Sequence, residues 1–80
     1  MKILAVDDDP FILELLPAMF DQADLNDLHT APSGPAALDM IKAQKVPFDC
    51  LLLDVDMPEM DGIELCRRIR TVPGYEDKPI

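Results

Sequence analysis

Aspartates gather at two places in this chain, and each group directly follows an apolar run. Asp7, Asp8 and a third aspartate follow Ile3–Val6, while Asp54 and Asp56 follow Cys50–Leu53. Carboxylates at close range repel one another and weaken a fold unless a cation lies among them. Hard oxygen donors without histidine or cysteine favour Mg²⁺, with Mn²⁺ as a substitute. The two groups therefore predict a magnesium site, provided that folding places the two apolar runs side by side.

A carboxylate beside such a metal can also act as a nucleophile. Asp54 is best placed to attack, because it stands at the end of the most apolar run with a rigid strand behind it. It would attack a phosphoryl group in line and form an aspartyl phosphate, while the metal neutralises charge on the phosphoryl oxygens. In this arrangement Asp8 binds the metal directly and Asp7 binds it directly or through a water. Asp56 offers its backbone carbonyl.

The elements that would position these residues follow from the hydrophobic pattern. Short continuous apolar runs predict buried strands at Lys2–Asp7 and Cys50–Leu53, and Leu28–Ala31 is predicted to form a weaker strand between them in the sequence. Continuous rather than alternating apolar residues are typical of parallel strands covered on both faces. Ligands bind such sheets beyond the carboxyl ends of the strands, where both aspartate groups would lie.

Three helices are predicted between and after these strands. The first begins with Asp9 as N-cap and Pro10 at the first helical position, and the second opens at Ser33-Gly34-Pro35. The third opens with the D-x-x-E spacing of a capping box at Asp61. Helical spacing predicts that the first helix buries one apolar face, made of Ile12, Leu15, Leu16, Met19, Phe20 and Ala23. Alternating strands and helices predict right-handed crossovers and a parallel α/β sheet.

The composition limits the classes of function. The chain has 80 residues, 16 of them acidic against 7 basic, and a net charge of -9. This balance argues against a nucleic-acid partner, which would need clustered Lys and Arg. No apolar segment approaches the roughly 20 residues of a membrane span, and none resembles a signal peptide, so a cytoplasmic location is expected. Cys50 and Cys66 lie far apart in sequence and are expected to be reduced thiols.

The segments "ILAVDDDP" and "LLLDVDMPEMDG", with the helix and turn signals between them, resemble the receiver domain of two-component response regulators. The resemblance implies that Asp54 is the phospho-acceptor, that Asp7 and Asp8 are the acidic pair, and that the main-chain oxygen of Asp56 completes the Mg²⁺ shell. It implies a flavodoxin-like, doubly wound parallel sheet with strand order 2-1-3. The implied role is phosphorelay signalling rather than enzymatic turnover. A sensor histidine kinase or phosphotransfer protein would donate the phosphoryl group.

The resemblance covers residues 1–80, and these supply only part of the family's pattern. Receiver domains resemble a sheet of five strands with five helices, whereas three of each are predicted here. Residues 1–80 are therefore expected to be the N-terminal portion of such a domain, without strands 4 and 5 and helices 4 and 5. The family's switch Ser or Thr and its phosphate-binding Lys have no counterpart in this chain.

Two alternatives to a signalling receiver stay open. A portion of a receiver domain would expose the edge of its third strand, which predicts a homodimer or a strand-exchanged assembly acting mainly as an interaction module. A Mg²⁺-dependent aspartyl phosphatase would share the D-x-D spacing of Asp54 and Asp56. It would turn over many equivalents of a phosphate ester, whereas a receiver would take up one phosphoryl group.

Overall fold

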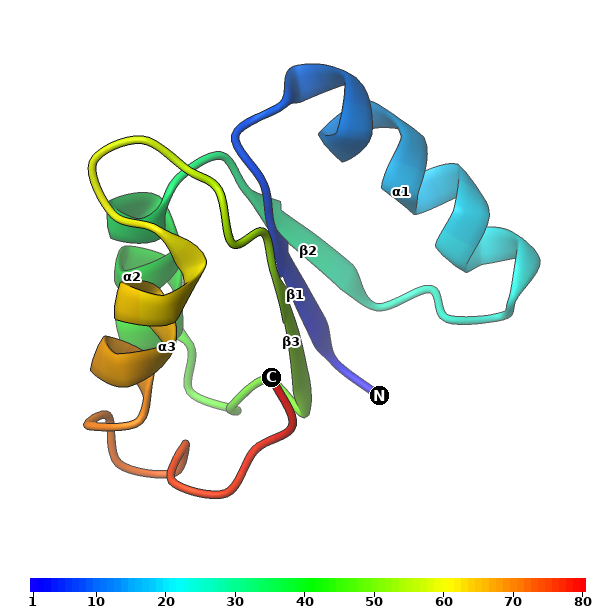
Figure 1. Cartoon of the computed structure of the whole chain (residues 1–80). Helices are drawn as coiled ribbons and strands as arrows, with labels where there is room; N and C mark the ends of the chain where they lie inside the picture. Colours follow the sequence, from blue (N-terminus) through cyan, green and yellow to red (C-terminus); the bar gives the residue numbers. More distant parts are fainter.

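The three strands form one parallel sheet in the computed structural model, which describes residues 1–80 (Figure 1). The strands are β1 (Ile3–Val6), β2 (Leu28–Ala31) and β3 (Cys50–Leu53), in the order β2-β1-β3. β1 pairs in parallel with both neighbours, so that Ile3 lies opposite Leu28 on one side and Cys50 on the other. This order confirms the predicted 2-1-3 arrangement of a doubly wound α/β sheet.

The helices begin where capping residues predicted them to begin. They are α1 (Pro10–Gln22), α2 (Gly34–Ala43) and α3 (Gly62–Ile69). Side-chain oxygens of Asp9, Ser33 and Asp61 accept the backbone N–H groups of the first turns of α1, α2 and α3 respectively. α2 and α3 lie together on one face of the sheet, and α1 lies on the other (Figure 1). None of these helices is long and apolar enough to cross a membrane.

The buried core lies between the sheet and the α2–α3 layer. Tyr75, in the segment after α3, is buried, and its hydroxyl oxygen accepts the N–H of Phe48 at 2.9 Å. This bond ties the segment after α3 to the residues that lead into β3. The core cluster consists of Leu4, Val6, Ala31, Ala37, Leu38, Ile41, Phe48, Leu51, Met57, Leu65, Ile69 and Tyr75.

The face of the sheet that carries α1 is much less covered than the sequence predicted. No residue of α1 is buried, and Leu15 and Met19, both expected inside, are 43% and 54% exposed. Leu52 of β3 points to this same side and is 42% exposed, although β3 was expected to be covered on both faces. The reason is geometric: one helix lies on this face (Figure 1), so α1 and β3 each have a side without a neighbour.

The outer edge of β3 is paired at one position. The N–H of Leu51 donates to the carbonyl of Pro79 at 3.0 Å, which brings residues 79–80 alongside the strand. Beyond that point Val55 and Ile63 stay exposed, at 60% and 63%. With Ile80 they help to line an open apolar pocket of about 270 Å³.

Candidate functional site

The hydrogen-bond ladders of the sheet extend to the aspartates at the carboxyl ends of two strands. The N–H of Asp7 donates to Ala31 at 3.1 Å, one residue past β1. In the same way the N–H of Asp54 donates to Val6 at 2.9 Å, one residue past β3. The second bond joins β3 to its neighbour β1, so the backbones of the two aspartates lie side by side and both carboxylates stand at the same edge of the sheet.

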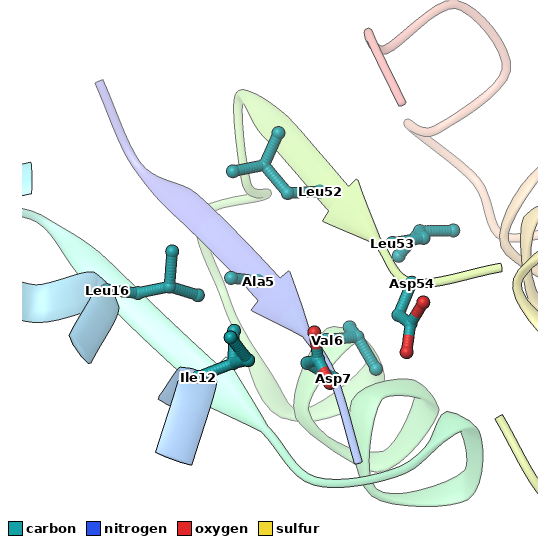
Figure 2. A pocket seen from close by; sticks show the side chains of 8 residues that line it. All are labelled: Ala5, Val6, Asp7, Ile12, Leu16, Leu52, Leu53 and Asp54. Atoms are coloured by element: carbon teal, nitrogen blue, oxygen red, sulfur yellow. The ribbon is translucent and has the colours of Figure 1, made fainter. Parts of the chain in front are cut away.

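Three carboxylates meet there. Oxygens of Asp7, Asp8 and Asp54 all lie within 4.8 Å of one another. Figure 2 shows the side chains of Asp7 and Asp54 at the adjoining ends of their strands. Asp7 and Asp54 are half-buried, whereas Asp8 is exposed. The structure therefore brings together the three side chains that the sequence indicated as metal ligands.

Local hydrogen bonds orient two of these carboxylates. Oδ1 of Asp7 accepts the N–H of Asp9 at 2.9 Å, and Oδ1 of Asp54 accepts the N–H of Asp56 at 3.3 Å. Each bond engages one oxygen of its carboxylate. The ion pairs of this chain involve other residues, so no Lys or Arg neutralises the three carboxylates. Their mutual repulsion at this range disfavours the fold by about 1 kcal/mol per pair at the dielectric constant of water.

The loop after Asp54 closes on itself. The N–H of Gly62 donates to the carbonyl of Val55 at 3.0 Å, so the two ends of the loop formed by residues 55–62 lie next to each other. A Cβ atom at position 62 would overlap the carbonyl oxygen of Asp54, so that only glycine allows α3 to start this close to β3. Sequence reasoning missed this contact. The side chain of Asp56 is exposed, and its carbonyl as a metal ligand stays a prediction.

A pocket leads from the carboxylates along the side of α1. It has a volume of about 210 Å³ and is open to solvent. Figure 2 shows the residues that line it, which are Ala5, Val6, Asp7, Ile12, Leu16, Leu52, Leu53 and Asp54. Six of the eight are apolar, and the two aspartates provide its acidic groups. A reactant can therefore reach Asp54 from solvent across an apolar surface.

The donor set fits a hard divalent cation. It consists of carboxylates, which Mg²⁺ and Mn²⁺ prefer, and it contains no imidazole or thiolate. Cys50 stands at the start of β3, at the other end of the strand from Asp54.

Two nearby aspartates, Asp9 and Asp61, act as helix N-caps, as the sequence predicted. Their Oδ1 atoms accept the N–H groups of Phe11 and Glu64 respectively.

Residues 3–80 match the family described as the response regulator receiver domain. The chain belongs to this family. The chemotaxis protein CheY4 of Vibrio cholerae superposes with a TM-score of 0.86 at 38% identity, over 99% of this chain and 63% of that chain. The receiver domain of the histidine kinase CKI1 of Arabidopsis thaliana, solved in complex with Mg²⁺ and BeF₃⁻, gives a TM-score of 0.76 at 29% identity. That match covers 86% of this chain and 54% of that one.

The chain is shorter than the receiver proteins it matches. It is 35% identical to the signal transduction histidine-protein kinase BarA of Escherichia coli K12 over all 80 residues, which make up 8% of that kinase. It also spans less than two thirds of CheY4. Receiver domains are signalling modules of two-component phosphorelays and interact with histidine kinases or phosphotransfer proteins. They typically bind Mg²⁺ at an acidic site.

Proposed function

We propose that this receiver domain accepts a phosphoryl group on Asp54 with the assistance of Mg²⁺. The observation that supports the proposal most strongly is the meeting of three carboxylates from two neighbouring strands within 4.8 Å, without a basic partner. Side chains of Asp7, Asp8 and Asp54 and the carbonyl of Asp56 would hold the metal. Bound there, it would offset negative charge on the incoming phosphoryl oxygens.

In the proposed transfer, a carboxylate oxygen of Asp54 attacks phosphorus and forms a new O–P bond. The bond between phosphorus and the donor breaks, and its electron pair leaves with the donor. With a phosphohistidine donor, the leaving atom is an imidazole nitrogen, which can take up a proton. The backbone of Asp54 is fixed by its bond to Val6, so the carboxylate is held at the mouth of the pocket. This fixed position favours in-line attack.

The proposed partner is therefore a histidine kinase or a histidine-containing phosphotransfer protein. The aspartyl phosphate would act as a switch that changes the receiver's surface for a downstream output. A Mg²⁺-dependent phosphatase activity is the less favoured role, since the family is a signalling family. The two roles differ in turnover: a switch retains about one phosphoryl group per chain, whereas a phosphatase releases many.

The test is intact mass after incubation with acetyl phosphate and Mg²⁺. We expect one added phosphoryl group in the wild-type chain and none in Asp54→Asn. Asp56→Asn is the matched control, because it changes an exposed carboxylate two residues away and keeps the carbonyl proposed as ligand. It should be labelled like the wild type.

Equal labelling of the wild type and Asp54→Asn would contradict the assignment of the acceptor. Absence of labelling in every protein would contradict the proposal for this chain. Release of many equivalents of inorganic phosphate per chain would instead support the phosphatase alternative.

We also propose that the 80-residue chain self-associates along the outer side of β3. The specific observation is the apolar pocket of about 270 Å³ beside that strand, together with the exposure of Val55 and Ile63. The bond from Leu51 to Pro79 shows that backbone can pair along this edge. If a second copy packs the outer edge of its own β3 against this one, it would cover Val55 and Ile63. It would also pair backbone N–H and C=O groups of β3 that have no partner in the single chain.

Light scattering at increasing concentration tests this association. The wild type should reach the mass of a dimer, whereas Ile63→Lys, which places a charge in the pocket, should stay a monomer. Met19→Lys changes an exposed apolar residue on α1, on the opposite layer, and should still dimerise. A monomeric wild type at the highest concentration would contradict the proposal.

A further inference from the structure

The loop between Asp54 and α3 has few anchors of its own. Its ends are joined by the bond from Gly62 to Val55, and Met57 is buried in the core. The second half of the loop has one further anchoring side chain, Met60, which is half-buried and packs against the core cluster. Asp56, whose carbonyl is the proposed metal ligand, lies inside this loop. Its position therefore depends on how the loop is held.

Met60 packs directly on the backbone of the first residue of α2. A Cβ atom built on Gly34 would lie 2.8 Å from Sδ of Met60, 3.1 Å from its Cβ and 3.2 Å from its Cγ. Normal carbon contacts are about 3.5 to 4.0 Å, so a side chain at position 34 would push Met60 outward. Gly34 is itself fixed, because Ser33 caps α2 by accepting the N–H of Ala36.

The backbone before Met60 is bent to reach this position. Glu59 has a φ of 66°, in the left-handed region that residues other than glycine seldom adopt. The N–H of Met60 donates to the carbonyl of Pro58 at 2.7 Å and closes the turn. A left-handed conformation of this type is strained for a residue other than glycine and persists where surrounding packing holds it. The contact with Gly34 provides such packing.

We infer that Gly34 and Met60 are positioning residues for the acceptor site. Their contact fixes the loop against α2 and thereby sets the position of Asp56, whose N–H donates to Oδ1 of Asp54 and whose carbonyl is the proposed ligand. This inference rests on the proposed function, because it concerns the metal site proposed there. It assigns to α2, which supplies no ligand, a role in the affinity of that site.

A double-mutant cycle tests the contact. The variants are Gly34→Ala, Met60→Ala and the double variant, with Mg²⁺ affinity measured by titration calorimetry. We expect Gly34→Ala to weaken Mg²⁺ binding by about tenfold, as is typical when a residue supporting the ligands is lost. Met60→Ala should also weaken binding. In the Met60→Ala background, Gly34→Ala should cause much less further loss, because the Sδ and Cγ atoms that it displaces are gone and only the contact with Cβ at 3.1 Å remains.

Met40→Ala is the matched control for general loss of packing. Met40 lies on the same helix, also packs partly buried against the core, and stands six residues, or about 9 Å, along the helix from Gly34. This variant should lower the melting temperature but leave Mg²⁺ affinity within error of the wild type. Equal losses in Met40→Ala and Gly34→Ala, or additive losses in the cycle, would overturn the inference.

A measurement on the metal-free protein separates this inference from the proposed function. In ¹H–¹⁵N spectra without metal, Gly34→Ala should shift the amide signals of Asp56 and Gly62, and Met40→Ala should leave them in place. Unshifted signals in Gly34→Ala would overturn the positioning role even if Mg²⁺ binds. Failure of the wild type to bind Mg²⁺ would contradict the proposed function, while the amide shifts would still decide whether the contact holds the loop.

Discussion

The three aspartates at the ends of β1 and β3 lie closer together than stability alone favours. Their oxygens are within 4.8 Å and no basic side chain pairs with them. An asparagine at any of these positions would keep the shape of the side chain without the charge. This arrangement of three carboxylates is the one that the proposed Mg²⁺ site requires.

Replacing Asp8 by Asn should stabilise the metal-free protein and remove its response to metal. We expect a gain of up to about 2 kcal/mol in the free energy of unfolding at low salt, because two repulsions, with Asp7 and with Asp54, are relieved, and a smaller gain at high salt, which screens the exposed Asp8. Mg²⁺ should raise the melting temperature of the wild type, since a ligand that binds only the folded state stabilises it, but not that of Asp8→Asn. Thermal unfolding with and without Mg²⁺ measures both effects.

Asp9→Asn is the control for this prediction. It removes a neighbouring charge, and Asn is as good an N-cap as Asp, so α1 should be retained. This variant should respond to Mg²⁺ like the wild type. An Asp8→Asn protein that is stabilised by Mg²⁺ as strongly as the wild type would contradict the assigned role of Asp8.

Asp49, which lies outside the acidic site, should make the stability of the protein depend on pH. The backbone N–H of Lys2 donates to its Oδ2 at 2.8 Å, and this bond is the main reason that the pKa of Asp49 is lowered from 3.8. Because the folded state lowers the pKa, the stabilisation is present above the unfolded value and is lost as pH falls through the folded one.

The variant Asp49→Asn isolates this charge. It should be less stable than the wild type near neutral pH, and the difference should close as the pH falls below 3.8. The effect should be small, because Asp49 is exposed to solvent. Urea unfolding at several pH values measures it. A difference that widens on acidification would contradict the assigned sign.

At the scale of elements, α3 depends on a single cap at the point where the acceptor loop ends. Oδ1 of Asp61 accepts the N–H of Glu64 at 2.8 Å. The reciprocal half of the predicted capping box does not form, because the Glu64 carboxylate accepts from Arg67 and Arg68 instead. The D-x-x-E spacing thus predicted the start of the helix correctly and one of its two bonds wrongly. Sequence spacing alone could not decide between these partners.

Asp61→Ala should therefore destabilise the protein by about 1 kcal/mol, the usual loss for an N-cap residue. Asp61→Asn keeps an acceptor oxygen and should lie within a few tenths of a kcal/mol of the wild type. Chemical denaturation of the three proteins compares their free energies of unfolding. Equal stability of Asp61→Ala and the wild type would show that the cap is not needed.

The apolar spacing of α1 illustrates a different limit of sequence reasoning. It predicted the helix but placed Leu15 and Met19 inside, whereas both are exposed. Periodicity identifies an apolar face of the helix. How much of that face is buried depends on which other elements pack against it. Leu52 shows the same limit for a strand, since a continuous apolar run does not reveal that one face of β3 is open.

At the scale of the whole molecule, the sequence predicted the order of elements, the sheet and the meeting of Asp7, Asp8 and Asp54. These features follow from strong local signals: apolar runs that end in aspartate, and helix caps in the first turns. Contacts such as that between Gly34 and Met60 were not predicted, because they join separate elements through shape. A glycine in a helix-start motif carries no sign of what packs against it.

The most direct test of the central claim is the Mg²⁺ dependence of phosphorylation by acetyl phosphate in the wild type and Asp8→Asn. The rate is followed by intact mass across a series of Mg²⁺ concentrations. If the carboxylates form one metal site around Asp54, the wild-type rate should rise and saturate with Mg²⁺, and the Asp8→Asn rate should stay low throughout. Equal rates in the two proteins, or a wild-type rate unchanged when Mg²⁺ is removed by chelation, would contradict the claim.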